Sequence, residues 1–398
     1  MRRERARAMT SDVRWCTNCL NMSTRPRISF DERGWCNACQ WVEEKKSLDW
    51  GKREKELQEI LDKYRSKSGG FDCIVPVSGG KDGSYVSYKL KHEYGMNPLA
   101  VTVTPALSLE LGDQNLRNFV NSGYNHIQIN PDVEAMRLLN RTGFIEKGFP
   151  YYGWLISIQA GVLRLAVNLN IPLLFYGEDG EVEYGGSTES KNKPMYDIEY
   201  MKRIYLEGGY EKVLKISGLS ESQLYFFMFP SEKELEGRDL KIAHWSYFES
   251  WDPYRNYLIA KERCGLKEVE GANSGTFTNF SQNDQALYAL HTYMMYLKFG
   301  FGRGTQDAGI EVRRGAMIRE QAVNLVRLYD GHYPDEFLEE YLKACPSAQI
   351  IADEINPFVK DGELYKELKA AQKLIEHEAD LLHALDIDIK QALDEDTA

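Results

Sequence analysis

The stretch from Phe71 to Ser84 constrains the fold of this chain more than any other. It reads FDCIVPVSGGKDGS, an apolar run followed by two glycines and then by polar residues. Because glycine lacks a Cβ atom, Gly79 and Gly80 let the backbone bend sharply and turn successive N–H groups toward one anion. The pattern therefore predicts a buried strand, a tight turn and the start of a helix.

The residues after this turn favour an anion-binding helix end. Val86, Leu90 and Tyr94 recur every four residues, and Gly95 is placed to end the helix. The free N–H groups and partial positive charge of its first turn would face the same anion, and Lys81 adds a full charge. An ordinary strand-to-helix turn is the alternative interpretation.

The residues of this turn can be compared with the sequence patterns of known phosphate-binding loops. A Walker A loop needs two glycines five positions apart, followed directly by Lys and by Ser or Thr, and neither Gly79 nor Gly80 has that spacing. Residues 78–84, SGGKDGS, resemble the pyrophosphate (PP) loop of the N-type ATP pyrophosphatases, which generally reads SGGxDS. Those enzymes cleave ATP between its α and β phosphates. Gly83 looks like an insertion that would displace Ser84 or loosen the turn.

Length and charge exclude several classes of protein. A chain of 398 residues with 43% hydrophobic content can bury a large core. No apolar run reaches about 18 residues, so we expect no membrane span, no signal peptide and a cytoplasmic location. The formal net charge of −11 would repel a long phosphate backbone, which argues against nucleic acid as substrate.

Four of the seven cysteines form two close pairs near the N-terminus. Cys16 and Cys19 form one CxxC pair, Cys36 and Cys39 form the other, and sixteen residues lie between them. This spacing is typical of two knuckles that bind one tetrahedral zinc ion through four thiolates, which leaves no position for substrate. We therefore predict a structural zinc site. Redox chemistry by one pair, or four free thiols, are the alternatives.

Strand and helix patterns alternate after the loop, which predicts a mainly parallel sheet. Further strands are expected at 98–104, 126–129 and 171–176, with helices at 48–64, 114–121 and 153–168. Beyond about residue 206 the strand pattern is lost, and helices are expected at 284–299 and 363–398. We predict three units: a zinc-binding four-cysteine module (1–50), a PP-loop domain (51–205) and a mainly helical substrate or partner domain (206–398).

Two glycine-rich segments could bind ligands. Residues 177–186, GEDGEVEYGG, follow the strand expected at 171–176, at the sheet edge where open α/β folds bind ligands. Glu178, Asp179 or Glu183 could hold Mg²⁺ there, and a solvated acidic loop is the alternative. Residues 299–315 contain Arg303 and Arg313, which could contact phosphate or a sugar nucleotide, or form surface salt bridges.

Four stretches together resemble the bacterial N-acetyl sugar amidotransferase family of O-antigen and nonulosonic acid pathways. They are the cysteine pairs with TRP at 24–26 and FD at 30–31 between them, the loop at 78–84, YFESWDP at 247–253, and GTFTNF at 275–280 with KFGFGR at 298–303. The resemblance runs from Cys16 to about Tyr333. It implies an α/β fold, with a parallel-sheet adenine nucleotide alpha hydrolase-like (PP-loop ATP pyrophosphatase) domain, an N-terminal zinc-ribbon-like module and a helical C-terminal region.

The resemblance also implies an activity, that of an AMP-forming C–N ligase of lipopolysaccharide biosynthesis. It would adenylate an acetamido carbonyl of a surface-polysaccharide sugar, release PPi, and form an acetamidino group with ammonia. ATP, Mg²⁺ and Zn²⁺ are the expected cofactors. No cysteine has the context of a glutaminase nucleophile, so we expect ammonia from a separate glutaminase and a channelling barrel resembling imidazole glycerol phosphate synthase. A homodimer is left open.

The resemblance and the motifs assign roles to particular residues. The expected catalytic residues are Lys81, Asp82 and Asp179. ATP would be bound by Ser78, Gly79, Gly80, Lys81, Asp82, Gly83, Ser84 and Thr104. The sugar would be bound by Glu178, Glu183, Tyr184, Asn279, Arg303, Thr305, Asp307 and Arg313. The metal ligands would be Cys16, Cys19, Cys36 and Cys39.

Two other functions are weighed against this one. A PP-loop tRNA sulfurtransferase can also carry cysteine knuckles, but the negative charge and the lack of a cysteine pair after the loop argue against it. A non-catalytic zinc-ribbon scaffold for sugar enzymes is the other alternative, and a failure to bind ATP would favour it.

Overall fold

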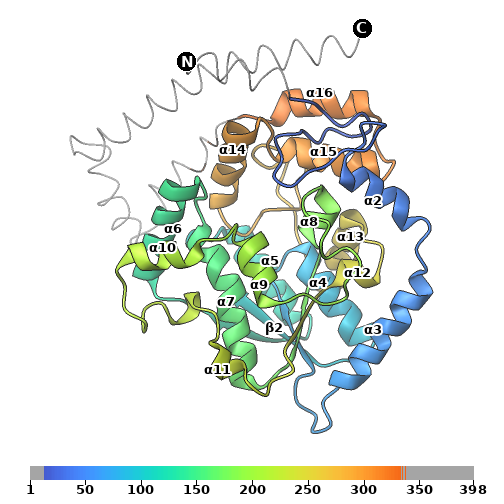
Figure 1. The fold of residues 1–398 in the computed structure, drawn as a ribbon. Coiled ribbons are helices and arrows are strands. Elements are labelled where there is room, and N and C mark those ends of the chain that lie inside the picture. Colours follow the sequence, from blue (N-terminus) through green and yellow to red (C-terminus); the bar gives the residue numbers. More distant parts are fainter. Residues whose placement is uncertain (1–12, 333, 335–336, 338–398) are drawn as a thin grey trace, which may run out of the picture.

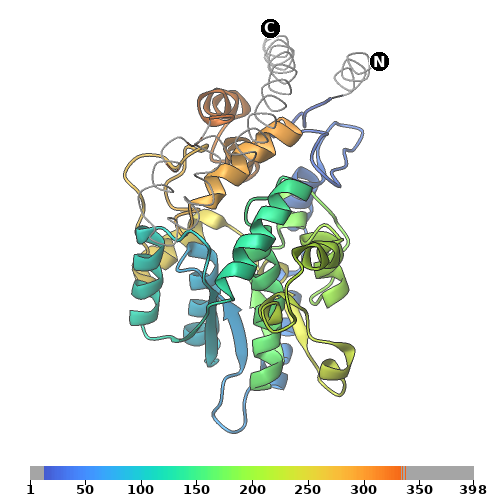
Figure 2. The ribbon, with the colours of Figure 1, turned by 90° about the vertical axis from the view of Figure 1, so that its left-hand side faces the viewer.

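The computed structural model describes residues 13–332, 334 and 337. Their centre is a five-stranded sheet with helices on both faces (Figures 1 and 2). The strands are β1 (Cys73–Pro76), β2 (Pro98–Val103), β3 (Asn125–Ile129), β4 (Leu173–Tyr176) and β5 (Lys241–His244), in the spatial order β3-β2-β1-β4-β5. Each pair of neighbours is parallel, which confirms the predicted fold class.

Helices connect and cover these strands. Before β4 they are α2 (Asn37–Lys45), α3 (Trp50–Tyr64), α4 (Lys81–Tyr88) with its π-helical continuation (Lys89–Glu93), α5 (Glu110–Asn121), α6 (Val133–Lys147) and α7 (Tyr152–Leu169). Between β4 and β5 they are α8 (Gly180–Tyr184), α9 (Ile198–Tyr200) with a π-helical turn (Met201–Tyr205), α10 (Tyr210–Ser217), a 3₁₀ turn (Tyr225–Phe227) and α11 (Glu232–Leu235). After β5 they are α12 (Trp245–Phe248), α13 (Pro253–Cys264), α14 (Leu287–Phe299), α15 (Arg303–Arg313) and α16 (Arg319–Tyr329).

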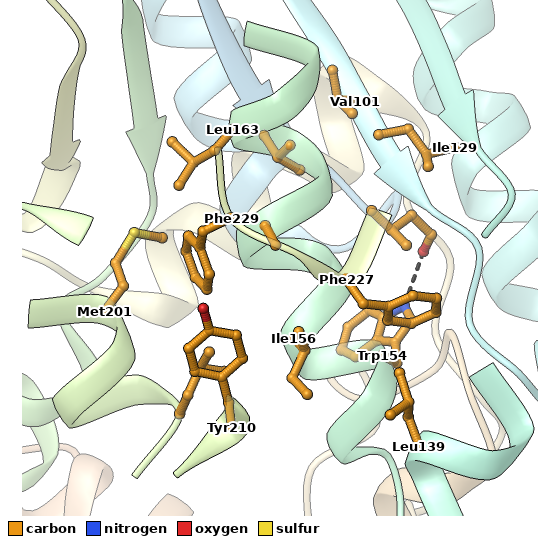
Figure 3. Packing of buried hydrophobic residues seen from close by; sticks show 14 of the residues in the cluster. Val101, Ile129, Leu139, Trp154, Ile156, Leu163, Met201, Tyr210, Phe227 and Phe229 are labelled. Carbon is orange, nitrogen blue, oxygen red and sulfur yellow. Dashed lines mark hydrogen bonds between the residues drawn. The ribbon is translucent and has the colours of Figure 1, made fainter. Parts of the chain in front are cut away.

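The sheet is buried on both faces, and for this reason its strands are apolar throughout. Ile74 and Val101 belong to the core between the sheet and α7, whereas Val75 turns to the opposite core, beneath α3 and α4. Figure 3 shows the first of these cores. Here the indole N–H of Trp154 donates to the carbonyl oxygen of Val103 at 2.9 Å, which fixes the start of α7 at the carboxyl end of β2.

The fifth strand corrects one prediction. The sequence pattern predicted no strand beyond about residue 206, yet β5 continues the sheet beside β4 at residues 241–244. With four residues, KIAH, it is too short to show the periodicity that identifies a strand. The rest of the described chain after residue 206 is mainly helical, and the helix expected at 363–398 lies outside the described residues.

The N-terminal and C-terminal parts of the described chain lie side by side above the sheet. The four-cysteine module packs beside α15 and α16 (Figure 1), where Leu20 shares an apolar cluster with Ala308 and Val323. Asn21 and Asn37 donate to the carbonyl oxygens of Tyr184 at 3.0 Å and Gly186 at 2.6 Å. Among the described residues, no helix is both long and apolar enough to cross a membrane.

Candidate functional site

The glycine turn after β1 forms a cradle at the start of α4. Gly79 has a φ angle of +81°, and a Cβ atom there would lie 2.3 Å from the backbone nitrogen of Leu116 on α5. No residue other than glycine fits this position without a shift of the backbone. Gly80 is the N-cap residue and offers no side-chain cap, so the N–H groups of the first turn of α4 could bind an anion.

Gly83 is not an insertion. Residues 81–88 form a regular α-helix, which places Gly83 where the SGGxDS pattern has its serine. A Cβ atom on Gly83 would lie 2.7 Å from the carbonyl oxygen of Pro76, so the glycine allows α4 to pack closely on the end of β1. Ser84 is buried, and its hydroxyl has no hydrogen-bond partner among the described residues. The looser turn expected from the sequence is therefore absent.

A cluster of charged side chains surrounds the start of α4. The ammonium group of Lys81 lies 2.5 Å from a carboxylate oxygen of Asp82, whose other oxygen accepts from the side-chain amide of Asn256 at 3.4 Å. Glu178, after β4, accepts from the hydroxyl of Tyr184 at 3.1 Å. Burial, and then the charge of Asp82, raises the pKa of Glu178 to about 7 against the opposing effect of Lys81.

Asp179, an expected catalytic residue, has a supporting position beside this cluster. Its carboxylate caps the first turn of α8, accepting from the backbone N–H groups of Glu181 at 3.1 Å and Val182 at 3.4 Å. It also accepts from the hydroxyls of Tyr205, at 3.0 Å, and Ser190. These contacts fix the loop that carries Glu178. They also hold the Asp179 carboxylate in surroundings different from those of the neighbouring Glu178.

Glu183 joins α8 to the four-cysteine module. Both of its carboxylate oxygens are engaged, one by the indole N–H of Trp41 at 2.9 Å and the other by the ammonium group of Lys45 at 2.7 Å. Glu183 and Lys45 are both buried. The structure therefore places this expected substrate ligand in an interface inside the protein.

Arg303 brings the C-terminal part of the chain to the loop. It begins α15, and its Nε atom lies 2.8 Å from a carboxylate oxygen of Asp307. Burial opposes the charge of Arg303, but the nearby Asp307, Tyr184 and Glu178 outweigh that effect and raise its pKa. The other oxygen of Asp307 accepts from two threonine hydroxyls, those of Thr276 at 2.7 Å and Thr278 at 3.1 Å. Arg303 thus belongs to the same charged cluster as Glu178.

Three other expected substrate ligands have partners elsewhere. The backbone N–H and the hydroxyl of Thr305 donate to Asp330. The side-chain amide of Asn279 donates to the carbonyl oxygen of Val269 at 3.3 Å. The guanidinium of Arg313 donates to the sulfur of Cys19 at 3.4 Å. The structure does not bring these three side chains to the charged cluster.

A cavity of about 200 Å³ adjoins the cradle at Ser78. Its walls come from the ends of β1 and β2, from α5 and α7, and from the segment before α14. The apolar lining includes Val101, Val103, Trp154, Ile158, Val162 and Tyr176, and the polar lining includes Ser78, Thr104, Asp113, Gln128, Gln159 and Asp284. The hydroxyl of Thr104 donates to the side-chain oxygen of Asn130 at 2.6 Å.

Sequence reasoning missed Asp284, Gln159 and Asn256. Burial raises the pKa of Asp284 to about 6, against the effects of Tyr288, Lys81 and Ser78. The backbone of Asp284 packs closely against α5 only because residue 112 is a glycine: a Cβ atom on Gly112 would lie 2.3 Å from the Cα atom of Asp284. No local pattern signals Asp284 or Asn256, but Gln159 is a polar residue within the apolar sequence of α7, and that contrast could have identified it.

The four cysteines form a group whose geometry could hold a metal ion. Their sulfur atoms all lie within 4.8 Å of one another, and the pairs Cys16–Cys39, Cys19–Cys36 and Cys36–Cys39 are each 3.6 Å apart. Four thiolates on one zinc ion, at Zn–S distances of about 2.3 Å, would be about 3.8 Å apart. The group therefore fits a single tetrahedral ion, whereas a cluster of several metal ions would need its thiolates further apart.

Comparisons with known proteins find a match in the C-terminal part of the chain. A family model described as LPS biosynthesis protein WbpG-like, C-terminal domain, matches residues 274–355. An uncharacterized protein of Methanocaldococcus jannaschii is 33% identical over 89 residues, which make up 22% of this chain and 32% of that protein. The chain therefore spans about a third of that relative's length.

Solved structures show only weak overall similarity. The U34-tRNA thiolase NcsA from Methanococcus maripaludis, with its 4Fe-4S cluster, has a TM-score of 0.32 and 14% identity, covering 68% of this chain and 80% of its own. A predicted subunit of a tRNA methyltransferase from M. jannaschii has a TM-score of 0.23 and 19% identity, covering 37% and 75%. Residues 274–355 thus match the model of the WbpG-like C-terminal domain family. With the loop on the parallel sheet, this match fits the PP-loop N-acetyl sugar amidotransferase family that the sequence motifs resemble.

Proposed function

We propose that this protein is an ATP-dependent amidotransferase that converts an acetamido group of a bacterial surface-polysaccharide sugar into an acetamidino group. One observation carries the proposal: Lys81 and Asp82, at the start of α4, share a charged cluster with Glu178 and with Arg303. Arg303 lies in the part of the chain that matches a domain of lipopolysaccharide biosynthesis proteins. The glycine turn after β1 and this part of the chain therefore contribute to one charged cluster.

The geometry supports a particular placement of ATP. The phosphates would lie at the first turn of α4, near Gly79, Gly80 and Lys81, where a helix N-terminus and a positive side chain favour anions. The base would enter the adjoining cavity, whose walls include Val103 and Trp154. Apolar and aromatic walls suit a flat heterocycle.

The proposed chemistry has two steps. The acetamido carbonyl is a poor electrophile because its nitrogen donates electrons into it, and its oxygen is a poor leaving group. That oxygen attacks the α-phosphorus of ATP, so PPi leaves and an O-adenylyl imidate forms. Ammonia then adds to the imidate carbon, AMP leaves with the C–O electron pair, and the product is the amidinium cation.

The protein's task in this scheme is mainly electrostatic. Lys81 stabilises the charge that develops on the departing PPi, and Arg303 orients an anionic or hydroxyl group of the sugar. Asp82 and Glu178 offer carboxylate oxygens suited to Mg²⁺, which would neutralise phosphate charge when bound. In the free protein Glu178 has its pKa raised to about 7 by burial and by Asp82, and a cation or ammonium beside it would lower that value again.

The ammonia is proposed to come from a separate glutaminase, with a channelling barrel similar to imidazole glycerol phosphate synthase. Outside the four-cysteine module the structure describes two cysteines, Cys73 and Cys264, and both are buried. Burial raises the pKa of each, which disfavours the thiolate that a glutaminase needs. Cys345 lies outside the described residues.

The decisive experiment incubates the full chain with ATP, Mg²⁺ and ammonium, together with candidate UDP-diacetamido sugars and nonulosonic acids. We expect AMP and PPi in equal amounts, and an acetamidino product by mass spectrometry. Glutamine should replace ammonium only when a glutaminase is added. Release of ADP and phosphate would refute the PP-loop assignment, and full activity with glutamine alone would refute the need for a partner.

A further inference from the structure

One side chain in the cavity beside the loop has an unpaired polar atom. Gln159 lies on α7, on the face that also presents Trp154, Ile158 and Val162 to the cavity. It is 7% exposed, and its side-chain oxygen has no hydrogen-bond partner among the described residues. A buried amide oxygen without a partner costs free energy, so its retention in an apolar wall needs a reason.

Among the described side chains that line this cavity, the unpaired amide is particular to Gln159. Gln128 lines the same cavity, but its amide donates to the hydroxyl of Thr104 at 2.8 Å. Asn140, beneath the start of α7, accepts from the backbone N–H of Trp154 at 3.1 Å. Of the described side chains that line the cavity, Gln159 alone has a buried polar atom left without a partner.

We propose that Gln159 recognises the adenine base of ATP and makes the site specific for it; this inference rests on the proposed function. A carboxamide offers one acceptor and one donor side by side. Adenine offers the matching pair, its 6-amino group as donor and N7 as acceptor, which is the edge that Gln contacts in nucleic acids. Guanine presents two acceptors at this edge, O6 and N7, so a single carboxamide cannot pair with both atoms.

The surroundings hold Gln159 in place for this role. The indole of Trp154 ties α7 to Val103 at the end of β2, and the hydroxyl of Tyr176 donates to the carbonyl oxygen of Ile158 at 3.3 Å. The residue before Gln159 is thus fixed to β4, and the helix is fixed to β2. A recognition side chain on such a rigid element needs little reordering when the ligand binds.

The test compares ATP with purine riboside triphosphate, which lacks the 6-amino group. Binding of each to the full chain is measured by calorimetry, without sugar. We expect ATP to bind about tenfold to hundredfold more tightly, because the analogue leaves the Gln159 oxygen unpaired. In Gln159→Leu the affinity for ATP should fall by a similar factor, and the two nucleotides should bind within about twofold of each other.

Two further measurements separate recognition from a structural role. The free Gln159→Leu variant should unfold at the same temperature as the native protein or higher, because leucine leaves no buried amide unpaired. Gln128→Leu, the matched control in the same cavity, should keep the native ratio of ATP to analogue affinity.

Equal binding of the two nucleotides by the native protein would overturn the inference while leaving ATP binding itself intact, and so would a native affinity ratio in Gln159→Leu. Failure of the native protein to bind either nucleotide would instead refute the proposed function.

Discussion

The cysteine sulfurs of the four-cysteine module and the polar groups of the loop site differ in how fully they are satisfied. In the module, the sulfur of Cys16 accepts from the backbone N–H groups of Cys19 at 3.4 Å and Cys36 at 3.1 Å. The other three sulfurs accept from Asn18, Asn21 and Arg313. At the loop, by contrast, Gly80 offers no side-chain cap and Glu178 has a raised pKa, and within the part of the chain that the structure describes the Gln159 oxygen has no partner.

We interpret this difference as that between a structural site and a reactive one. A closed set of partners fixes the geometry of the thiolates and leaves nothing for substrate to add. An incomplete set is retained at a cost in stability, and a ligand completes it. Variants of the module should therefore change stability and metal content, whereas variants of the loop should change turnover and leave the fold intact.

The largest expected effect is the loss of the metal in Cys36→Ser. A structural zinc site contributes its binding energy to folding, so this variant should lose the ion and the order of the N-terminal segment. Metal content is measured by mass spectrometry of the native protein, and local order by hydrogen exchange. Cys264→Ala, which removes a buried thiol outside the module, is the control and should keep one ion per chain. Full metal occupancy in Cys36→Ser would contradict the four-ligand arrangement.

A second expected effect is the loss of turnover in Lys81→Ala and Asp82→Ala. We expect each to lower kcat by at least about tenfold, because one removes positive charge at the phosphates and the other a carboxylate at the proposed Mg²⁺ position. PPi release is the measurement, and circular dichroism checks the fold. Lys55→Ala, an exposed lysine on α3, should keep native activity. Native rates in both loop variants would mean that residues 78–84 form only a turn.

Arg313 provides a third test, because sequence and structure assign it to different sites. The sequence predicted a substrate ligand, whereas its guanidinium donates to Cys19. Arg313→Met should therefore weaken metal binding by about tenfold to hundredfold, as expected for a group that supports a metal ligand. Competition with a chelator measures this affinity. A raised KM for the sugar with unchanged metal affinity would restore the sequence-based role.

Features encoded within a short segment could be predicted from the sequence, whereas features that depend on tertiary contacts could not. The cysteine pairs and the SGGKDGS turn lie within short segments, so spacing and residue type were enough to predict the metal group and the strand–turn–helix. Asp284 and Asn256 reach the loop only through tertiary packing, at Gly112 and along α13, and no short-range pattern records such an approach. Gly83 was misread because its role is a close contact with Pro76, which sequence alone does not display.

The acidic segment after β4 shows the same limit and leads to the smallest predicted effect. Its acids could not be ranked from the sequence, because the turn into α8 directs Glu178, Asp179 and Glu183 to three different surroundings. Burial and the charge of Asp82 raise the pKa of Glu178 to about 7 in the folded protein, above the value of about 4.3 expected when it is unfolded. The folded state therefore holds this proton more tightly, so Glu178 lowers stability progressively as pH rises from about 4.3 to 7.

Glu178→Gln cannot ionise, and its melting temperature should exceed that of the native protein by a few degrees at pH 8 and by less at pH 5, while its turnover falls. Thermal unfolding of both proteins across this pH range is the measurement, with Glu59→Gln, at an exposed position of α3, as the control. A constant difference in melting temperature at all pH values would show that Glu178 does not titrate in this range.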